Sequence, residues 1–202
     1  MRNKNLRNKL TLVILGRSGS GKGTQARFII SRLGKRYAKH LSTGYFLREL
    51  LKKPGLTVRI LQKAMSRGEL APAWLAAHLW LRELVENGHA DKHLVFDGAP
   101  RRIWEAGLID EVMRWHKRVL PVCLYIDVSY QEGMRRLLLR GRKDDRAAAI
   151  RNRMKFFVKD VLPVIDFYRR RGRLVRVDGN SAVEIVRRNI DKALAKKFGS
   201  KW

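Results

Sequence analysis

The sequence is poor in cysteine and in acidic residues, and it has no long apolar run. Its single cysteine, Cys123, lies within an apolar stretch, which argues against disulfides and cysteine-based metal clusters and indicates a small core residue. No hydrophobic run approaches the roughly 18 residues that a membrane span requires. The basic stretch 1–9 lacks the apolar core of a signal peptide, so we expect a cytoplasmic protein. The five histidines show no metal-ligand spacing.

Acidic residues are far outnumbered, with 18 Asp and Glu against 45 Lys and Arg, a formal net charge of +27. Such a surface attracts polyanions. A site for several phosphates needs only about half a dozen cations, so most of the excess must lie elsewhere. Two explanations stay open: a general basic or solubility bias, and association with RNA or ribosomes. The first is favoured, because the basic residues are spread along helices and no nucleic-acid-binding module is recognisable.

The most informative stretch is LTLVILGRSGSGKGTQ, residues 10–25, in which an apolar run ends at Gly16 and a helix pattern begins after Lys22. The spacing Gly16-x4-Gly21-Lys22 is that of a phosphate-binding loop between a strand and a helix. Glycines allow successive N–H groups to point at one anion, and the lysine and the helix dipole add positive charge. The strict motif has Ser or Thr directly after the lysine, whereas here Gly23 precedes Thr24.

Strand and helix patterns alternate along the rest of the chain. The apolar runs predict strands at 10–15, 93–97, 119–127 and 173–177, with a short extended segment at 40–44. The periodicity predicts helices at 25–33, 45–51, 57–67, 72–86, 101–118, 130–139, 144–171 and 182–197, with the long one bent or restarted at Pro163. At 202 residues the chain suits one α/β domain with a parallel sheet and a ligand site at the carboxyl ends of the strands.

Four further motifs follow the loop in order: LSTGYFLR (41–48), GELAP (68–72), FDGAPRRIWEA (96–106) and RLLLRGRKDD (136–145). Together with Gly-Lys-Gly-Thr they resemble the adenylate kinase family of nucleoside monophosphate (NMP) kinases, over residues 10–195. The resemblance implies a P-loop three-layer α/β/α fold with a five-stranded parallel sheet. It also implies a basic tail (1–9), one kinase domain (10–197) and a C-terminal tail (198–202). Within the domain we expect an NMP-binding insertion at about 41–72 and a very short lid at about 140–145.

The family implies the reaction ATP + AMP ⇌ 2 ADP with Mg²⁺, catalysed by a monomer. Phosphoryl transfer between two nucleotides needs cations from several segments, and no general base for a phosphate nucleophile. By resemblance, ATP is bound by Gly19, Ser20, Gly21, Lys22, Gly23, Thr24, Arg136 and Arg140. The monophosphate is bound by Thr43, Arg48, Gly98, Arg101, Glu105, Arg142 and Arg153. The catalytic residues are Lys22, Arg101, Arg142 and Arg153. Asp97 either holds Mg²⁺ through water or caps a turn.

Three positions depart from the family pattern. Tyr45 stands where Asp is usual, Glu105 stands where Gln usually reads the acceptor adenine, and Ala71 stands where Val is usual. An ionised Glu only accepts hydrogen bonds, which suits guanine better than adenine and leaves GMP, CMP and UMP as alternative acceptors. Thr43 favours adenine. The lid is too short for a cysteine-bearing zinc site, so we expect no structural zinc.

Overall fold

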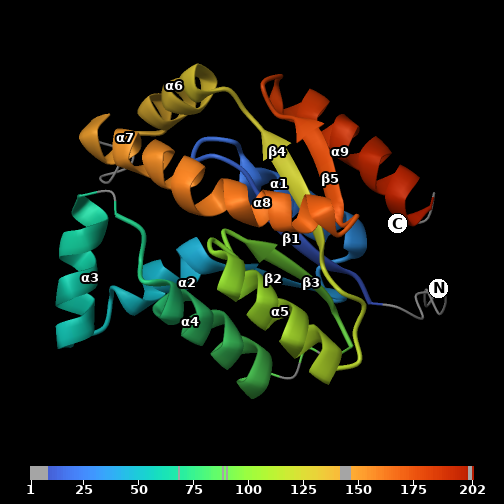
Figure 1. Ribbon diagram of the computed structural model, residues 1–202, viewed down its shortest axis with the longest axis horizontal. Coiled ribbons are helices and arrows are strands. Elements are labelled where there is room, and N and C mark those ends of the chain that lie inside the picture. The colour runs from blue at the N-terminus through green and yellow to red at the C-terminus, as the bar shows by residue number, and fades with distance from the viewer. Residues whose placement is uncertain (1–8, 68, 88, 90, 142–146, 200–201) are drawn as a thin grey trace.

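The computed structural model describes residues 9–67, 69–87, 89, 91–141, 147–199 and 202. They form a five-stranded sheet with helices on both faces (Figure 1). The strands are β1 (Thr11–Leu15), β2 (Ala38–Ser42), β3 (His93–Asp97), β4 (Val122–Asp127) and β5 (Leu174–Asp178). The helices are α1 (Lys22–Leu33), α2 (Thr43–Leu50), α3 (Leu56–Ser66), α4 (Ala73–Glu86), α5 (Ile103–Trp115), α6 (Tyr130–Arg140), α7 (Ala147–Phe156), α8 (Leu162–Arg170) and α9 (Val183–Phe198), with a π-helical turn η1 (Phe157–Val161) between α7 and α8.

The sheet is parallel throughout, in the order β2-β3-β1-β4-β5, which confirms the predicted five-stranded parallel sheet. All five residues of the central strand β1 are buried. Its Val13 is in register with Phe96 of β3 and Cys123 of β4. Because both faces of a parallel sheet are covered, such strands are continuous apolar runs. The carboxyl ends of the strands therefore meet at one edge, where ligands bind in folds of this class.

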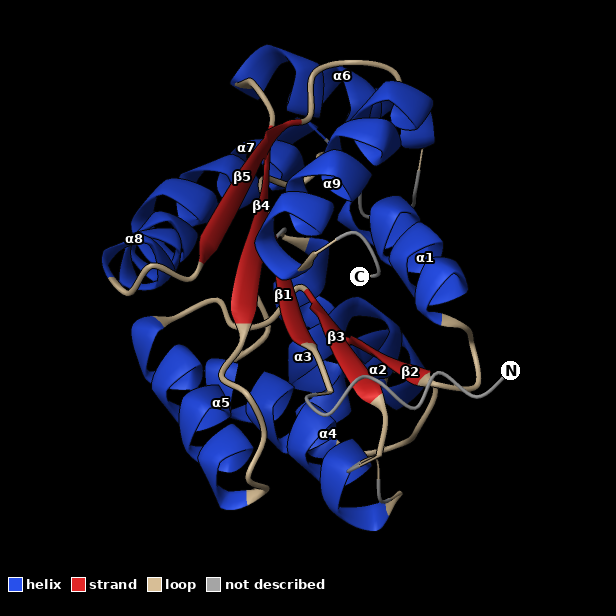
Figure 2. Ribbon diagram, turned by 90° about the vertical axis from the view of Figure 1, so that its right-hand side faces the viewer, coloured by secondary structure: helices blue, strands red, loops and turns tan. Residues whose placement is uncertain are grey.

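Alternate residues of β1 serve two separate cores. Val13 and Leu15 pack with residues of α4, α5 and α8, whereas Leu12 and Ile14 pack with residues of α1 and α9. Figure 2 shows α1 and α9 on one side of the strands and α5 and α8 on the other. Side chains alternate in direction along a strand, so four apolar residues are enough to hold both helical layers.

Cys123 is fully buried and is a free thiol, as predicted for a small core residue. Burial raises the pKa of its thiol, which keeps the sulfur protonated and unreactive. Within the described ranges, none of the helices combines the length and the apolar character needed to cross a membrane.

Two predicted elements begin two or three residues later than expected. The helix predicted at 101–118 starts at Ile103, because Arg102 has an extended backbone, and it ends at Trp115, ahead of the positive φ of Lys117. The strand predicted at 119–127 starts at Val122. Pro121 precedes it, and a proline has no N–H to donate to a neighbouring strand.

The helix predicted at 144–171 is bent as expected, but the bend is a π-helical turn placed before Pro163. The N–H of Leu162 donates to the carbonyl of Phe157, five residues earlier. Proline has no N–H and its ring crowds the carbonyl four residues before it, so the preceding turn widens. The predicted start of this helix, Asp144 and Asp145, lies outside the described residues.

The segment expected as a C-terminal tail ends in a packed side chain. Trp202 is buried, its indole N–H donates to the carbonyl of Asp191, and the Arg32 guanidinium lies 5.0 Å from its ring centroid. The indole thus closes the core between α1 and α9.

A bidentate ion pair links α5 to the residue before β5. Arg173 donates to both carboxylate oxygens of Asp110, at 2.8 and 2.6 Å, and both side chains are largely buried. We predict that Asp110→Ala lowers the free energy of unfolding by about 3 kcal/mol, because it leaves a buried guanidinium without its carboxylate. Urea titration measures the loss. The control is Asp166→Ala, which removes the more exposed partner of Arg169 and Arg170 and should have a much smaller effect. Equal losses in the two variants would contradict the prediction.

Candidate functional site

The phosphate loop joins the end of β1 to the start of α1, as the motif predicts. Gly19 and Gly21 have φ angles of 84° and 81°, in the left-handed region that favours glycine. A Cβ at Gly19 would lie 2.3 Å from the carbonyl oxygen of Gly133, so the loop passes directly against α6. Among the described residues no side chain caps α1. Its first N–H groups and its dipole therefore favour an anion.

The Lys22 ammonium lies within this loop. Its Nζ donates to the carbonyl oxygens of Gly16 and Arg17, both at 2.8 Å. Burial lowers the pKa of Lys22 to about 8, against the raising influence of Asp97. An anion beside the ammonium would raise that pKa again, so a bound phosphate and the charged lysine stabilise each other.

Asp97 ends β3 next to the phosphate loop. Its Oδ2 accepts a hydrogen bond from Ser42 Oγ at 3.5 Å and lies 3.5 Å from His40 Nε2. A Cβ on Gly23 would be 3.3 Å from the same oxygen, which places Asp97 against the first turn of α1. Burial alone would raise the pKa of Asp97, but His40 and Lys22 outweigh burial and lower it overall. The carboxylate is therefore ionised and faces the loop.

Arg101 lies in the turn between β3 and α5, and hydrogen bonds within that segment hold it in place. Its Nε donates to the carbonyl of Gly98 at 2.8 Å, and its backbone N–H donates to Glu105 Oε1 at 3.2 Å. Two buried polar atoms near it, Glu105 Oε2 and Thr43 Oγ1, have no hydrogen-bond partner among the described residues. Burial raises the pKa of Glu105. Arg48 is exposed and lines the same cleft.

On the α6 side, Arg136 is held by three acceptors. Its Nε donates to Glu132 Oε1 at 2.6 Å, and its terminal nitrogen donates to the carbonyls of Asn180 and Ser181 at 3.1 and 3.0 Å. These contacts fix the plane of the guanidinium beside the loop that leads into α9. A fixed guanidinium plane is suited to stacking against an aromatic ring.

One cleft of about 870 Å³ brings most of the candidate residues together. The predicted residues that line it are Gly19, Gly21, Lys22, Gly23, Thr24, Arg48, Asp97, Gly98, Arg101, Arg136, Arg140 and Arg153. Ser20, Thr43 and Glu105 are buried behind its surface. Arg142 lies outside the described residues.

Sequence reasoning missed His40, which lines the cleft and lies close to Asp97. The signal was present, because His40 and Ser42 are two residues apart on β2 and share a face of the strand. Among the residues that the structure describes, no group of three or more His, Cys, Asp or Glu side chains could hold a metal ion.

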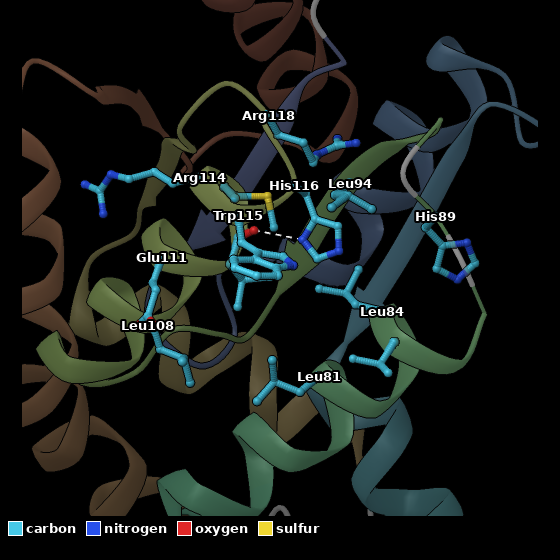
Figure 3. A pocket seen from close by; sticks show the side chains of 13 residues that line it. Leu81, Leu84, His89, Leu94, Leu108, Glu111, Arg114, Trp115, His116 and Arg118 are labelled. Atoms are coloured by element: carbon cyan, nitrogen blue, oxygen red, sulfur yellow. Dashed lines mark hydrogen bonds between the residues drawn. The ribbon is translucent and has the colours of Figure 1, made fainter.

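A second hollow, of about 830 Å³, lies between α4 and α5 (Figure 3). It has mainly apolar walls, including Leu81, Leu84 and Val112, and Trp115 beside it is 84% exposed. Arg118, at its edge, donates to the carbonyl of Leu10 just before β1. The hollow is therefore at the amino ends of the strands, away from the phosphate loop, and none of the described candidate residues lines it.

Comparison with known proteins agrees with this geometry. A family model described as adenylate kinase matches residues 14–173. The chain is 32% identical to adenylate kinase 1 of Nostoc sp. over 183 residues, which cover 91% of this chain and 97% of that protein. It is 31% identical to the adenylate kinase of Azobacteroides pseudotrichonymphae over 194 residues, covering 94% and 99%. It is 38% identical to UMP-CMP kinase 1 of Oryza sativa subsp. japonica over 181 residues, covering 88% and 71%.

The matched range contains the phosphate loop and all the candidate residues of the cleft. Because the family model covers most of the chain and the relatives align over nearly its whole length, the chain belongs to the adenylate kinase family.

Proposed function

We propose that this nucleoside monophosphate kinase transfers the γ-phosphoryl group of ATP to AMP, giving two ADP. The supporting observation is the cleft beside the phosphate loop, in which Lys22, Arg101 and Arg153 approach from three different elements. Two nucleotides placed end to end bring several negative charges together. Converging cations offset that repulsion and hold donor and acceptor in line.

In the proposed mechanism the loop binds the donor. Backbone N–H groups of Gly19, Ser20, Gly21, Gly23 and Thr24 cradle the ATP phosphates, and the Lys22 ammonium leaves its carbonyl partners to bind a phosphate oxygen. The fixed guanidinium of Arg136 stacks on the donor base, and Arg140 binds the phosphates with Lys22.

On the acceptor side, Arg48 and Arg101 bind the phosphate of the monophosphate, next to Gly98. An oxygen of that phosphate attacks the γ-phosphorus while the bond from γ-phosphorus to the bridging β–γ oxygen breaks, so ADP leaves. The attacking oxygen is already ionised, and no side chain has to remove a proton. Arg153, with Arg142, stabilises the charge on the transferring group.

Asp97 is the residue proposed to hold Mg²⁺, through water. Mg²⁺ keeps several waters and is bound through one or two carboxylates together with substrate phosphates, so a single ionised carboxylate facing the phosphate loop fits it. The ion would supply positive charge to the donor phosphates.

The unpartnered Oε2 oxygen of Glu105 supports a second candidate for the acceptor nucleotide, a monophosphate other than AMP. Oε2 is buried, has no partner among the described residues, and can accept a hydrogen bond from an exocyclic amine or a ring N–H of a base. Adenine, cytosine and guanine all carry an exocyclic amine, and guanine and uracil carry a ring N–H, so this oxygen does not single out adenine. The similarity to a UMP-CMP kinase supports the pyrimidine acceptors. Thr43 Oγ1, which is also buried and unpartnered in the described chain, is a second contact for the base.

The proposed setting is a monomer in the cytoplasm, because one chain lines the whole cleft and its nucleotide substrates are available there. Association with RNA or ribosomes has no support beyond the net charge of +27. It is therefore not part of the proposed function.

Lys22→Met tests the central role of the loop. We expect kcat to fall at least about 100-fold, because the main point charge on the transferring group is lost while the side-chain volume is kept. A coupled assay of ADP formation measures turnover, and thermal unfolding checks that the fold is intact. Lys192→Met, an exposed lysine on α9, is the control. Normal turnover in Lys22→Met would refute the role.

Glu105→Gln tests the choice of acceptor. An amide both donates and accepts, so it complements the N1 and N6 edge of adenine better than a carboxylate does. We expect kcat/KM to rise about tenfold for AMP relative to GMP and CMP. The assay covers all four monophosphates. Glu111→Gln, an exposed carboxylate on the same helix, should leave the ratios unchanged. Unchanged ratios in Glu105→Gln would remove Glu105 from acceptor recognition.

The buried Glu105 carboxyl also makes the effect of Glu105→Gln on the stability of the fold depend on pH. Burial raises the pKa of Glu105 above its ordinary value of 4.5, so the folded chain holds this proton more tightly than the unfolded chain does. The contribution of the group to stability is therefore lost as the pH rises above about 4.5. We expect the gain in melting temperature of Glu105→Gln over the parent protein to be larger at pH 7 than at pH 4. The opposite order would contradict the burial argument.

A further inference from the structure

Arg17 lies inside the phosphate loop, and its side chain contacts two other segments of the chain. Its neighbours Gly16 and Ser18 line the cleft, whereas Arg17 does not. Its Nε donates to the carbonyl of Val128, just beyond β4, at 3.1 Å, and its guanidinium carbon lies 4.6 Å from the ring centroid of Phe157. The side chain therefore joins the loop to two other segments.

Phe157 is the first residue of η1, the turn between α7 and α8. Its ring is buried and stacks on Tyr125 of β4, with centroids 6.4 Å apart and planes 24° apart. Arg153 lies four residues earlier, one turn along the continuous helix, and lines the cleft. A contact that fixes Phe157 relative to the loop therefore also fixes the part of α7 that presents Arg153.

The backbone of Arg17 takes part in the hydrogen bonds inside the phosphate loop. Its carbonyl accepts from Lys22 Nζ at 2.8 Å and from the N–H of Ser20 at 3.1 Å. The residue clamped against Phe157 thus also supplies two internal acceptors of the loop that is proposed to bind the donor phosphates. A shift of Arg17 would alter the loop directly.

We propose that Arg17 is a positioning residue, which holds the phosphate loop and the Arg153-bearing helix in one fixed arrangement through Phe157 and Val128. It acts through Lys22 and Arg153 and touches no substrate itself. The expected effect of Arg17 on catalysis rests on the proposed function. Its expected effect on ATP binding rests on the contacts described above.

The test is a double-mutant cycle with Arg17→Ala, Phe157→Leu and the combination. The first readout is the ATP dissociation constant, measured by titration without acceptor, and the second is kcat for transfer. We expect each single variant to weaken ATP binding about fivefold, a usual size for one stacked cation, and the double variant to be no worse than either. We expect kcat to fall in the same non-additive way.

The chain offers a matched control pair. Arg171 stacks on Phe167 at 3.7 Å, beside the α8–β5 turn. Arg171, Phe167 and Arg17 do not line the cleft, whereas Phe157 does, so Arg17→Ala is the variant to compare with this pair. Arg171→Ala and Phe167→Leu should lower the melting temperature as the first pair does, but leave ATP affinity and kcat unchanged. Arg17→Lys keeps the charge without the planar stack and should behave like Arg17→Ala.

Three outcomes would overturn the proposal: additive effects of the Arg17 and Phe157 variants, full function in Arg17→Lys, or a lowered melting temperature with unchanged ATP affinity. If the parent protein binds ATP but transfers phosphate to none of the monophosphates, the proposed function fails, while the cycle on ATP affinity still decides the role of Arg17. If Arg17→Ala does not fold, Arg17→Met in the same cycle keeps the aliphatic packing and gives the same decision.

Discussion

Positive charge is gathered around the phosphate loop before any nucleotide binds, and holding it there is the constraint on which the site depends. Asp97 is the only acidic side chain among the described residues that line the cleft. Two of the cations there bind backbone carbonyls: Lys22 binds those of Gly16 and Arg17, and Arg101 binds that of Gly98, whereas Arg136 is ion-paired with Glu132. Carbonyl dipoles stabilise a cation without cancelling its charge. The charge thus stays available to phosphate groups.

Several cations elsewhere on the surface bind carboxylates. Arg135 pairs with Glu132, Arg169 with Asp166, and Arg176 with Asp127. These exposed pairs contribute little stability, but they neutralise charge locally. Lys22 and Arg101 thus keep their charge beside the phosphate loop, whereas the cations of these surface pairs are neutralised by carboxylates.

Much of this could be predicted from the sequence, because it depends on local chemistry. β1 is apolar at every position after Thr11, and β3 is bounded by turn residues, so both strands are recognisable without a structure. The glycine and lysine spacing predicted the loop, since left-handed backbone angles need glycine. His40, Arg17 and Trp202 were not identified. Their roles depend on contacts with residues far away in the chain, on Asp97, Phe157 and Arg32, and no local pattern encodes those distances.

The π-helical turn η1 divides the apolar surface of one long helix into two. Before it, Ile150 and Met154 of α7 pack with Leu137 of α6 in a small cluster of their own, and after it Val164 and Tyr168 of α8 pack in the main core. The α6–α7 pair therefore has a small core of its own, apart from the main core. Arg140 and Arg153 lie on these two helices and line the cleft, so the packing of this small core sets the position of two cleft cations together.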